Sequence, residues 1–173
     1  MKPLISIIIL NWNGWKDTVE CLESLFQITY SNYSVILIDN GSVDDSLEKI
    51  HNYCNGILRV ESSFFKNNPN NKPIKIFEFS RRESEINDWK KNDFENIPSD
   101  RKLILIKNEK NYGFAEGNNI GIRFSLSNLK PDYIMLLNND TVVDNFFLQY
   151  LTEKMANNES IGFSCPKIYY YDF

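Results

Sequence analysis

The stretch Leu4-Ile5-Ser6-Ile7-Ile8-Ile9-Leu10 decides the fold class of this 173-residue chain. Every side chain in it except that of Ser6 is apolar, and most are β-branched. A short run of this kind is typical of a strand that is buried on both faces, as the strands of parallel sheets are. The polar residues Asn11-Trp12-Asn13-Gly14 follow at once, so the predicted strand ends near Leu10.

A helix is expected directly after this first strand. From Trp15 to Phe26 the apolar side chains recur every three or four residues, which indicates an amphipathic helix. The same periodicity predicts that Lys16, Glu20 and Glu23 point outward, away from the core.

The alternation of strand and helix then repeats. Tyr33 to Ile38 predict a second strand. A second helix is expected up to about Tyr53, and Ser42 with Asp45 three residues later resembles a capping box at its start. This alternation predicts βαβ units in a parallel sheet, with both helices on one face of the sheet because such crossovers are right-handed.

Similar patterns return in the second half of the chain. Strands are expected at 103–106 and 132–137, with a glycine-rich segment and a helix between them, and an amphipathic helix is expected from Asp144 to Met155. Weaker patterns predict two further strands. One is expected to start near Ile57, and the other is expected from Ile161 to Cys165. The expected fold class is therefore α/β, with a Rossmann-like, mostly parallel sheet flanked by helices.

Residues 61–102 interrupt the regular pattern. They contain the loop Asn67-Asn68-Pro69-Asn70-Asn71 and a stretch from Ile74 to Phe79 that fits an extra strand. The charged residues that follow are expected to be partly helical around Glu83 to Lys91 and to form a solvated face. Because the length suits one domain, we predict a single domain over 1–173 with 61–102 as an insertion.

Composition and charge exclude several classes of function. With 19 Lys plus Arg, 23 Asp plus Glu and a pI near 5.1, the chain offers no electrostatic reason to expect nucleic-acid binding. The apolar run near the start is far shorter than the roughly 20 residues that span a bilayer, and no signal-peptide pattern follows it. We therefore expect no membrane span in this chain and a cytoplasmic location.

The cysteines and the single histidine limit the catalytic mechanisms that the chain can use. Cys21, Cys54 and Cys165 are widely spaced and form no zinc-binding pattern, so reduced, buried thiols are expected. The single histidine, His51, lies in a predicted helix away from any motif, so catalysis by a Ser-His or Cys-His pair is not expected. Any catalysis would therefore use carboxylates or a metal ion.

Polar residues follow three of the predicted strands. Asn11 to Asn13, Asp39, and Asn138-Asn139-Asp140 each come directly after an apolar run. If these strands are parallel neighbours, the three polar ends lie along one edge of the sheet, where open α/β sheets bind ligands. A carboxylate with amides suits a divalent cation that carries phosphates, although the same residues are also common turn formers.

Several of these positions admit two interpretations. Asp39 either caps the following turn or accepts hydrogen bonds from a ligand, and Trp12 either stacks on a base or covers the sheet edge. Gly113, Gly117 and Gly121 lie at a strand-to-helix junction, where glycines allow backbone to approach an anion. Their four-residue spacing is equally consistent with a smooth helix face that packs on the sheet.

Five motifs in order resemble family 2 glycosyltransferases of the GT-A fold. The resemblance spans nearly the whole chain apart from 61–102, and the segments Gly113 to Gly121 and Asn138 to Thr141 are most similar to the branch often labelled rhamnosyltransferase-like. The motifs are Ile7-Ile8-Ile9-Leu10-Asn11-Trp12-Asn13, Cys21-Leu22-Glu23-Ser24-Leu25, Val35-Ile36-Leu37-Ile38-Asp39-Asn40-Gly41-Ser42, the segment from Gly113-Phe114-Ala115 to Asn119-Ile120-Gly121, and Leu136-Leu137-Asn138-Asn139-Asp140-Thr141.

The resemblance implies roles for particular residues. Asn11, Trp12 and Asn13 would flank the nucleobase of a nucleotide-sugar donor, and Asp39 would bind its base or ribose. Gly113 and Asn118 would lie beside the nucleotide. Asn138, Asn139 and Asp140 would stand for the Asp-x-Asp motif of the family, with Asp140 as the ligand of Mg²⁺ or Mn²⁺.

Two positions depart from the family pattern. Asn138 replaces the first aspartate of the motif and offers no charge, so the affinity for metal without donor is expected to be modest. Asn118 stands where many members carry an arginine against the base, which leaves UDP-, dTDP- and GDP-linked donors as alternatives.

The resemblance implies that the chain is the donor-binding part of an inverting, metal-dependent glycosyltransferase of cell-surface polysaccharide biosynthesis. The acceptor would be a glycan or a lipid-linked hydroxyl, and the full-length protein would lie in the cytoplasm or at the inner face of the membrane. The chain is expected to be truncated before the acceptor-binding half, with the catalytic base beyond Phe173. A non-catalytic nucleotide-sugar-binding or regulatory domain is the alternative, and a nucleotidyltransferase is a more distant one.

Overall fold

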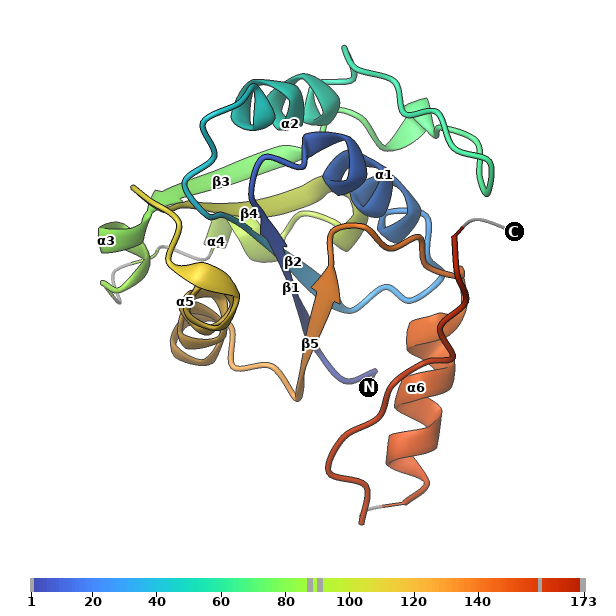
Figure 1. The fold of residues 1–173 in the computed structure, drawn as a ribbon. Helices are drawn as coiled ribbons and strands as arrows, with labels where there is room; N and C mark the ends of the chain where they lie inside the picture. Colours follow the sequence, from blue (N-terminus) through green and yellow to red (C-terminus); the bar gives the residue numbers. More distant parts are fainter. Residues whose placement is uncertain (1, 87–88, 90–91, 159, 172–173) are drawn as a thin grey trace.

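The computed structural model describes residues 2–86, 89, 92–158 and 160–171 (Figure 1). The strands are β1 (Ile5–Asn11), β2 (Tyr33–Asp39), β3 (Lys75–Ser80), β4 (Lys102–Lys107) and β5 (Tyr133–Asn138). The helices are α1 (Trp15–Leu25), α2 (Ser46–Cys54), α3 (Arg81–Ser84), α4 (Asn92–Glu95), α5 (Gly113–Asn128) and α6 (Phe147–Ala156), with single 3-10 turns η1 (Pro69–Asn71) and η2 (Ser99–Arg101).

The five strands form one sheet in the order β3-β4-β2-β1-β5, and every neighbouring pair is parallel. The side chains of β1, β2 and β4 are buried almost throughout, because helices cover both faces of the sheet. The predicted α/β class with a mostly parallel sheet is therefore confirmed.

The two faces of the sheet are covered by different helices (Figure 1). Helices α1 and α2 contact each other, and their apolar side chains form one core cluster with Ile7, Ile9 and Leu37 of the sheet. On the opposite face α5 packs against β1 and β2, in a second cluster that includes Ile8 and Ile36. The prediction that the first two helices share one face is confirmed.

Two of the three α5 glycines allow this helix to approach the sheet closely. A Cβ atom at Gly117 would lie 2.5 Å from Leu10 Cδ1, and one at Gly121 would lie 2.7 Å from Ile8 Cγ2. Real Cβ atoms do not approach other atoms so closely, so these two positions form the smooth helix face. Gly113 differs, since a Cβ there would meet no atom within 4 Å.

The segment 61–102 contributes an edge strand to the sheet. The extra strand predicted at Ile74 to Phe79 is present as β3, which pairs with β4. Of the helix expected around Glu83 to Lys91, the structure contains the short α3, while 87–88 and 90–91 lie outside the described residues. The assignment of one domain with 61–102 as an insertion stays a prediction.

Two predicted strands are absent. Ile57 and Leu58 donate their backbone N–H groups to Asn52 O at 2.9 and 3.1 Å, so this segment closes the end of α2 rather than starting a strand. Residues 161–165 have no strand partner among the described residues, and Phe163 is 91% exposed. Both predictions rested on short apolar runs, which do not by themselves provide a neighbouring strand.

The predicted outward face of α1 is wrong at one position. Glu23 is fully buried, because residues 66–72 fold over this side of the helix. Periodicity within α1 carries no information about a chain segment that returns from more than 40 positions away. Across the described residues, the structure contains no helix with the length and apolar character needed to cross a membrane.

Candidate functional site

The carboxyl ends of β2, β1 and β5 lie next to one another on one edge of the sheet. Asn11 pairs in register with Asp39, and Leu10 pairs with Asn138. The prediction that the three polar strand ends share an edge is confirmed. The loops after β2 and β4 also leave toward opposite faces, which is the arrangement that opens a ligand crevice at strand ends.

Asn11 and Asp39 form a buried hydrogen-bond network with Ser42. Asn11 Nδ2 donates to Asp39 Oδ1 at 2.8 Å and to Ser42 Oγ at 3.1 Å. Ser42 donates its hydroxyl to Asp39 Oδ1 at 2.6 Å and its backbone N–H to Asp39 Oδ2 at 3.1 Å. Asp39 therefore caps the turn after β2, and its predicted contact with a ligand remains untested.

This network also corrects the predicted capping box. The hydroxyl of Ser42 is bound to Asp39, while α2 begins four residues later at Ser46 without a side-chain cap from Asp45. The predicted pairing of Ser42 with Asp45 is wrong, because the Ser42 oxygen accepts from Asn11 Nδ2 and from the backbone N–H of Asn13 instead of from a helix N–H.

The loop between β1 and α1 is fastened to the same turn. Asn13 has a positive φ of 52°. Its side-chain Oδ1 accepts from Val43 N at 2.8 Å, and its backbone N–H donates to Ser42 Oγ at 3.0 Å. The neighbouring Trp12 is 55% exposed, so its indole is not a core residue and stands beside this pair of loops.

Asn40 is a central residue of the site that the sequence did not indicate. Its buried side-chain amide donates to Asn111 Oδ1 at 2.9 Å and to Gly113 O at 3.2 Å. Its carbonyl oxygen accepts from Asn108 Nδ2 at 2.9 Å and from the backbone N–H of Tyr112 at 3.2 Å. The only sequence signal was an Asn-Gly pair after a strand, which also fits an ordinary turn.

Replacement of Asn40 by alanine is expected to lower the free energy of unfolding by about 1–3 kcal/mol, because it leaves buried polar groups of the β4–α5 loop unpaired. Thermal melts of Asn40→Ala and of Asn119→Ala, an exposed asparagine on α5, provide the comparison. Equal melting temperatures for the two variants would contradict this assignment.

The start of α5 is a partly capped helix N-terminus. Gly113 has a φ of 81°, and the N-cap residue Tyr112 makes no side-chain cap, but the backbone N–H of Gly113 donates to Asn111 Oδ1 at 2.7 Å. Asn118, one turn further on, is 5% exposed and donates its Nδ2 to Phe114 O at 2.9 Å. Backbone N–H groups at a helix N-terminus favour an anion such as phosphate.

The last residue of β5 and the two residues after it have different surroundings. The side chain of Asn138 is exposed, while its carbonyl oxygen accepts from Thr141 Oγ1 at 2.6 Å. Asn139 turns toward α1, where its Nδ2 donates to Thr18 Oγ1 at 3.0 Å. Asp140 is exposed and takes part in no hydrogen bond within the described part of the chain.

Asp140 stands between two open cavities. One has a volume of about 230 Å³ and is lined by Leu10, Phe114, Asn118, Leu136, Leu137, Asn138, Asn139 and Asp140. The other has a volume of about 290 Å³ and is lined by Asp17, Glu20, Asp140, Thr141 and Tyr171. The first cavity therefore brings Asn118 of α5 together with the polar residues after β5.

Asp140 is the predicted metal ligand, and the structure shows no complete set of protein ligands around it among the described residues. Across residues 2–86, 89, 92–158 and 160–171, no group of three or more His, Cys, Asp or Glu side chains is arranged to hold a metal ion. The exposed Asp140 and the neutral oxygen of Asn138 fit a hard cation that takes its remaining ligands from phosphate and water.

The cysteine closest to the site is chemically inert. Cys21 is fully buried in α1, and its thiol donates to Asn138 O at 3.6 Å. Burial raises the pKa of Cys21 to about 12, so the thiol is protonated at neutral pH. Cys54 is also buried, whereas Cys165 is exposed, so the expectation of buried thiols is wrong for Cys165.

Comparison with known proteins identifies relatives of the chain. The model of glycosyl transferase family 2 matches residues 6–86 and 83–172. Glycosyltransferase GlyG of Streptococcus pneumoniae serotype 4 is 22% identical over 160 residues, which are 92% of this chain and 38% of that protein. The chain thus spans well under half the length of this curated relative.

Solved structures with a similar fold include two complexes with nucleotide ligands. The mannosyltransferase PcManGT from Pyrobaculum calidifontis, in complex with GDP-Man and Mn²⁺, has a TM-score of 0.58 at 12% identity and aligns with 90% of this chain and 33% of its own. Residues 1–349 of S. aureus TarS in complex with UDP have a TM-score of 0.54 at 13% identity and align with 95% of this chain and 38% of their own. At such identities the likeness shows a shared fold, which is of the GT-A type.

Proposed function

The chain belongs to glycosyl transferase family 2, and we propose that it forms the donor-binding part of an enzyme that transfers a sugar from a nucleoside diphosphate to an acceptor hydroxyl. The observation that carries this proposal is the single sheet edge at which Asn11, Asp39 and Asp140 meet beside the N-terminus of α5. One edge thus offers amides, a carboxylate and a helix N-terminus to one elongated, anionic ligand.

The proposed donor lies across this edge. Its base and ribose contact Trp12 and Asn13, where the half-exposed indole of Trp12 provides a flat apolar surface. Asn11 and Asp39 contribute from beneath, because they are buried and bind each other and Ser42, which fixes the turn on which the base and ribose lie.

The diphosphate of the donor lies near the first turn of α5, because backbone N–H groups at a helix N-terminus favour negative charge. Asn111 already binds the N–H of Gly113, so the N–H groups of the following residues are the proposed donors.

The sugar end of the donor is assigned to the cavity of about 230 Å³, which is lined by Asn118, Asn138, Asn139 and Asp140. Asn139 shapes this end of the site indirectly, because its amide is bound to Thr18 at the start of α1. In support of such a donor, similar folds have been solved in complex with GDP-Man and Mn²⁺, with UDP, and with UDP-GlcNAc.

Asp140 is proposed to hold Mg²⁺ or Mn²⁺ together with the diphosphate. A divalent cation there would act as a Lewis acid that stabilises the negative charge on the leaving diphosphate, an effect worth several kcal/mol. Asn138 contributes an uncharged oxygen or amide to the donor. Because no group of three or more acidic, His or Cys side chains among the described residues is arranged to hold a metal, metal and donor are expected to bind together rather than separately.

The reaction is proposed to be an inverting transfer. The acceptor hydroxyl of a glycan or lipid-linked substrate attacks the anomeric carbon as the diphosphate leaves, through a transition state with oxocarbenium character. The residues of this chain bind and orient the donor for that step. No residue of this chain is proposed as the general base.

Calorimetry tests the donor-binding proposal directly. The folded chain is titrated with UDP, dTDP and GDP, each with Mn²⁺, with Mg²⁺ and with a chelator. At least one nucleotide is expected to bind, and its affinity is expected to fall at least about tenfold when the metal is removed, which corresponds to 1.4 kcal/mol. A folded chain that binds none of the three nucleotides overturns the proposal.

Asp140→Ala is expected to remove the metal dependence of nucleotide binding without unfolding the protein. Asp140 is exposed and unbonded within the described residues, so the free energy of unfolding should change by less than about 0.5 kcal/mol. Asp93→Ala is the control, because Asp93 is an exposed acidic residue on α4 that lines neither of the two cavities. If Asp140→Ala binds nucleotide and metal as the wild type does, Asp140 is a turn residue and the metal assignment is wrong.

A further inference from the structure

Arg81 connects the segment 61–102 to the start of α5. It is the first residue of α3, directly after the edge strand β3. Its guanidinium carbon lies 4.0 Å from the centroid of the Tyr112 ring, and its Nη2 lies 3.3 Å from Glu116 Oε1. One side chain thus contacts a ring and a carboxylate on a different part of the chain.

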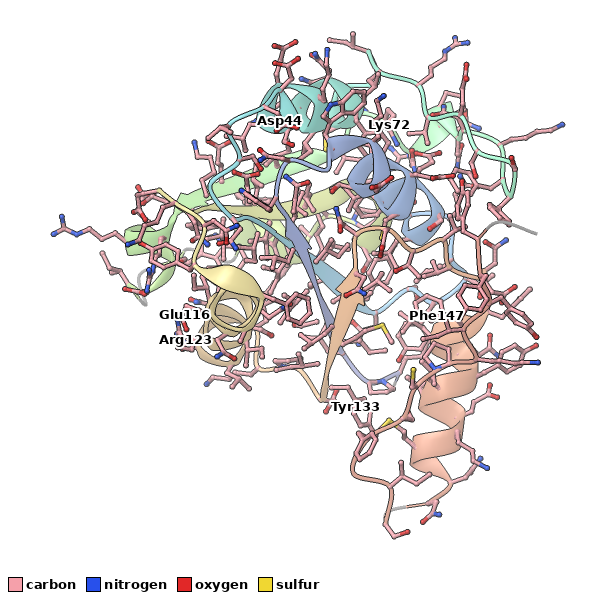
Figure 2. All side chains as sticks on the ribbon, viewed as in Figure 1. Asp44, Lys72, Glu116, Arg123, Tyr133 and Phe147 are labelled. Carbon is pink, nitrogen blue, oxygen red and sulfur yellow. The ribbon has the colours of Figure 1, made fainter. Side chains whose placement is uncertain are left out.

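Tyr112 and Glu116 lie on either side of the turn that contains Gly113. Tyr112 is the N-cap residue of α5, and Glu116 belongs to its first turn. Glu116 is also bound by Arg123 Nη2 at 2.7 Å, and the two side chains lie together on α5 (Figure 2). Hydrogen bonding from Arg123 holds the pKa of Glu116 below its usual range, so Glu116 is charged at neutral pH.

The first turn of α5 is therefore held from two directions. From the side of β2, Asn40 accepts the backbone N–H of Tyr112 and donates to Gly113 O. From the side of β3, Arg81 stacks on the Tyr112 ring and pairs with Glu116. Between these two anchors Gly113 faces open space, where a ligand can approach the helix N-terminus.

We propose that Arg81 is a positioning residue of the donor site, which fixes the first turn of α5 so that its backbone N–H groups meet the diphosphate. This role rests on the proposed function. It gives the segment 61–102 a part in ligand binding, because β3 and α3 carry Arg81 to the site. Binding groups have to be held within about 0.5 Å of their productive geometry by the contacts around them, and Gly113, the first residue of α5, has no side chain that could make such contacts.

An arginine is suited to this role for a physical reason. Its planar guanidinium stacks on an aromatic ring and offers N–H donors at its edge to a carboxylate at the same time. A lysine ammonium retains the charge, yet it cannot present a flat surface to the ring and a fork of donors to Glu116 together.

The test compares three variants of the 173-residue chain. Arg81→Met retains the apolar stem and removes the guanidinium, and Arg81→Lys retains the charge. Arg82→Met is the matched control, since Arg82 is the exposed next residue of the same helix and its loss changes the net charge equally. Each variant is measured by hydrogen exchange of the amides in 112–117 and by calorimetry with whichever nucleotide the wild type binds.

Arg81→Met is expected to weaken nucleotide binding about tenfold, as expected for loss of a partly buried cation–π contact together with an ion pair. The amides of 112–117 are expected to exchange faster by a similar factor, while amides in β1 and β2 retain their protection. Arg81→Lys should recover part of the affinity, and Arg82→Met should match the wild type.

Each outcome supports or overturns the proposal. If Arg81→Met and Arg82→Met have the same affinity, or if the 112–117 amides are equally protected in both, Arg81 is not a positioning residue and the donor site itself is unaffected. If the wild type binds no nucleotide, the proposed function and the role of Arg81 both fall.

Discussion

Glu23→Ala is expected to lower the free energy of unfolding by about 3–5 kcal/mol, the usual cost of removing one partner from a buried ion pair. Glu23 is fully buried in α1 and pairs with Lys72 Nζ at 2.9 Å. It also accepts hydrogen bonds from Tyr53 OH at 2.8 Å, Gln27 Nε2 at 3.0 Å and Asn68 N at 2.5 Å. Alanine would leave Lys72 as an uncompensated charge and the other donors unpaired.

The effect should be large because this carboxylate joins three parts of the chain. Glu23 lies on α1, Tyr53 on α2, and Lys72 in the segment that precedes β3, where the labelled Lys72 lies close to both helices (Figure 2). Lys72 Nζ also lies 4.1 Å from the centroid of the Tyr53 ring. Burial, with the adjacent carboxylate, raises the pKa of Tyr53 well above its usual value, so its hydroxyl remains a donor.

Thermal and urea denaturation measure this prediction. For a chain of this size, about 3–5 kcal/mol corresponds to a fall in melting temperature of about 6–20 °C. Glu48→Ala is the matched control, because Glu48 lies on the exposed side of α2 and should change stability by less than about 0.5 kcal/mol.

A double-mutant cycle with Lys72→Met separates the ion pair from the remaining contacts. The double variant Glu23→Ala/Lys72→Met should lose less stability than the sum of the two single losses, because it leaves no lone buried charge. Strictly additive losses would show that Glu23 and Lys72 are not energetically coupled.

Gly41→Ala is expected to lower the free energy of unfolding by about 2–4 kcal/mol, from positive-φ strain and from a clash with backbone. Gly41 has a φ of 74° in the turn after β2. A Cβ atom there would lie 2.9 Å from Asn111 N and closer still to the backbone carbon atoms of Lys110. Backbone atoms cannot turn aside as a flexible side chain can, so the β4–α5 loop would have to move.

Gly113→Ala separates the two causes. Gly113 has a comparable φ of 81°, but a Cβ there meets nothing within 4 Å, so alanine at 113 carries the strain without the clash. Stability measured by urea denaturation should therefore fall by about 1 kcal/mol for Gly113→Ala and clearly more for Gly41→Ala. Equal losses of stability in the two variants would mean that the clash with the Lys110 backbone does not add to the cost of Gly41→Ala.

Much of the fold could be predicted because the signals are local. The apolar runs at 4–10, 33–38 and 103–106 each become a parallel strand that is buried almost throughout, since such runs have no polar face to present to water. The run at 132–137 also becomes a parallel strand, but it is the partly exposed edge strand β5. The place of the site follows from the same patterns, because parallel strands bring their carboxyl ends to one edge. The polar residues after those strands were therefore identifiable in advance.

The errors arise where a short pattern depends on a distant partner. Ile57 and the segment 161–165 are apolar enough for strands, yet they have no strand partner among the described residues. Ser42 was assigned to α2, whereas the carboxylate of Asp39 binds its hydroxyl. Glu23 fits a solvated helix face in sequence, and only the return of residues 66–72 buries it.

The sequence by itself determined the α/β fold, the family and the sheet edge that carries the candidate site, because periodicity and strand-end residues are properties of neighbouring positions. Only the tertiary structure decided which glycine packs and which stays open, since Gly117 and Gly121 face β1 while Gly113 faces free space. The tertiary structure likewise decided that Asn40 and Arg81 hold the start of α5. Their partners lie more than 30 positions away in the chain, and contacts over such distances form only when the sheet brings its segments together.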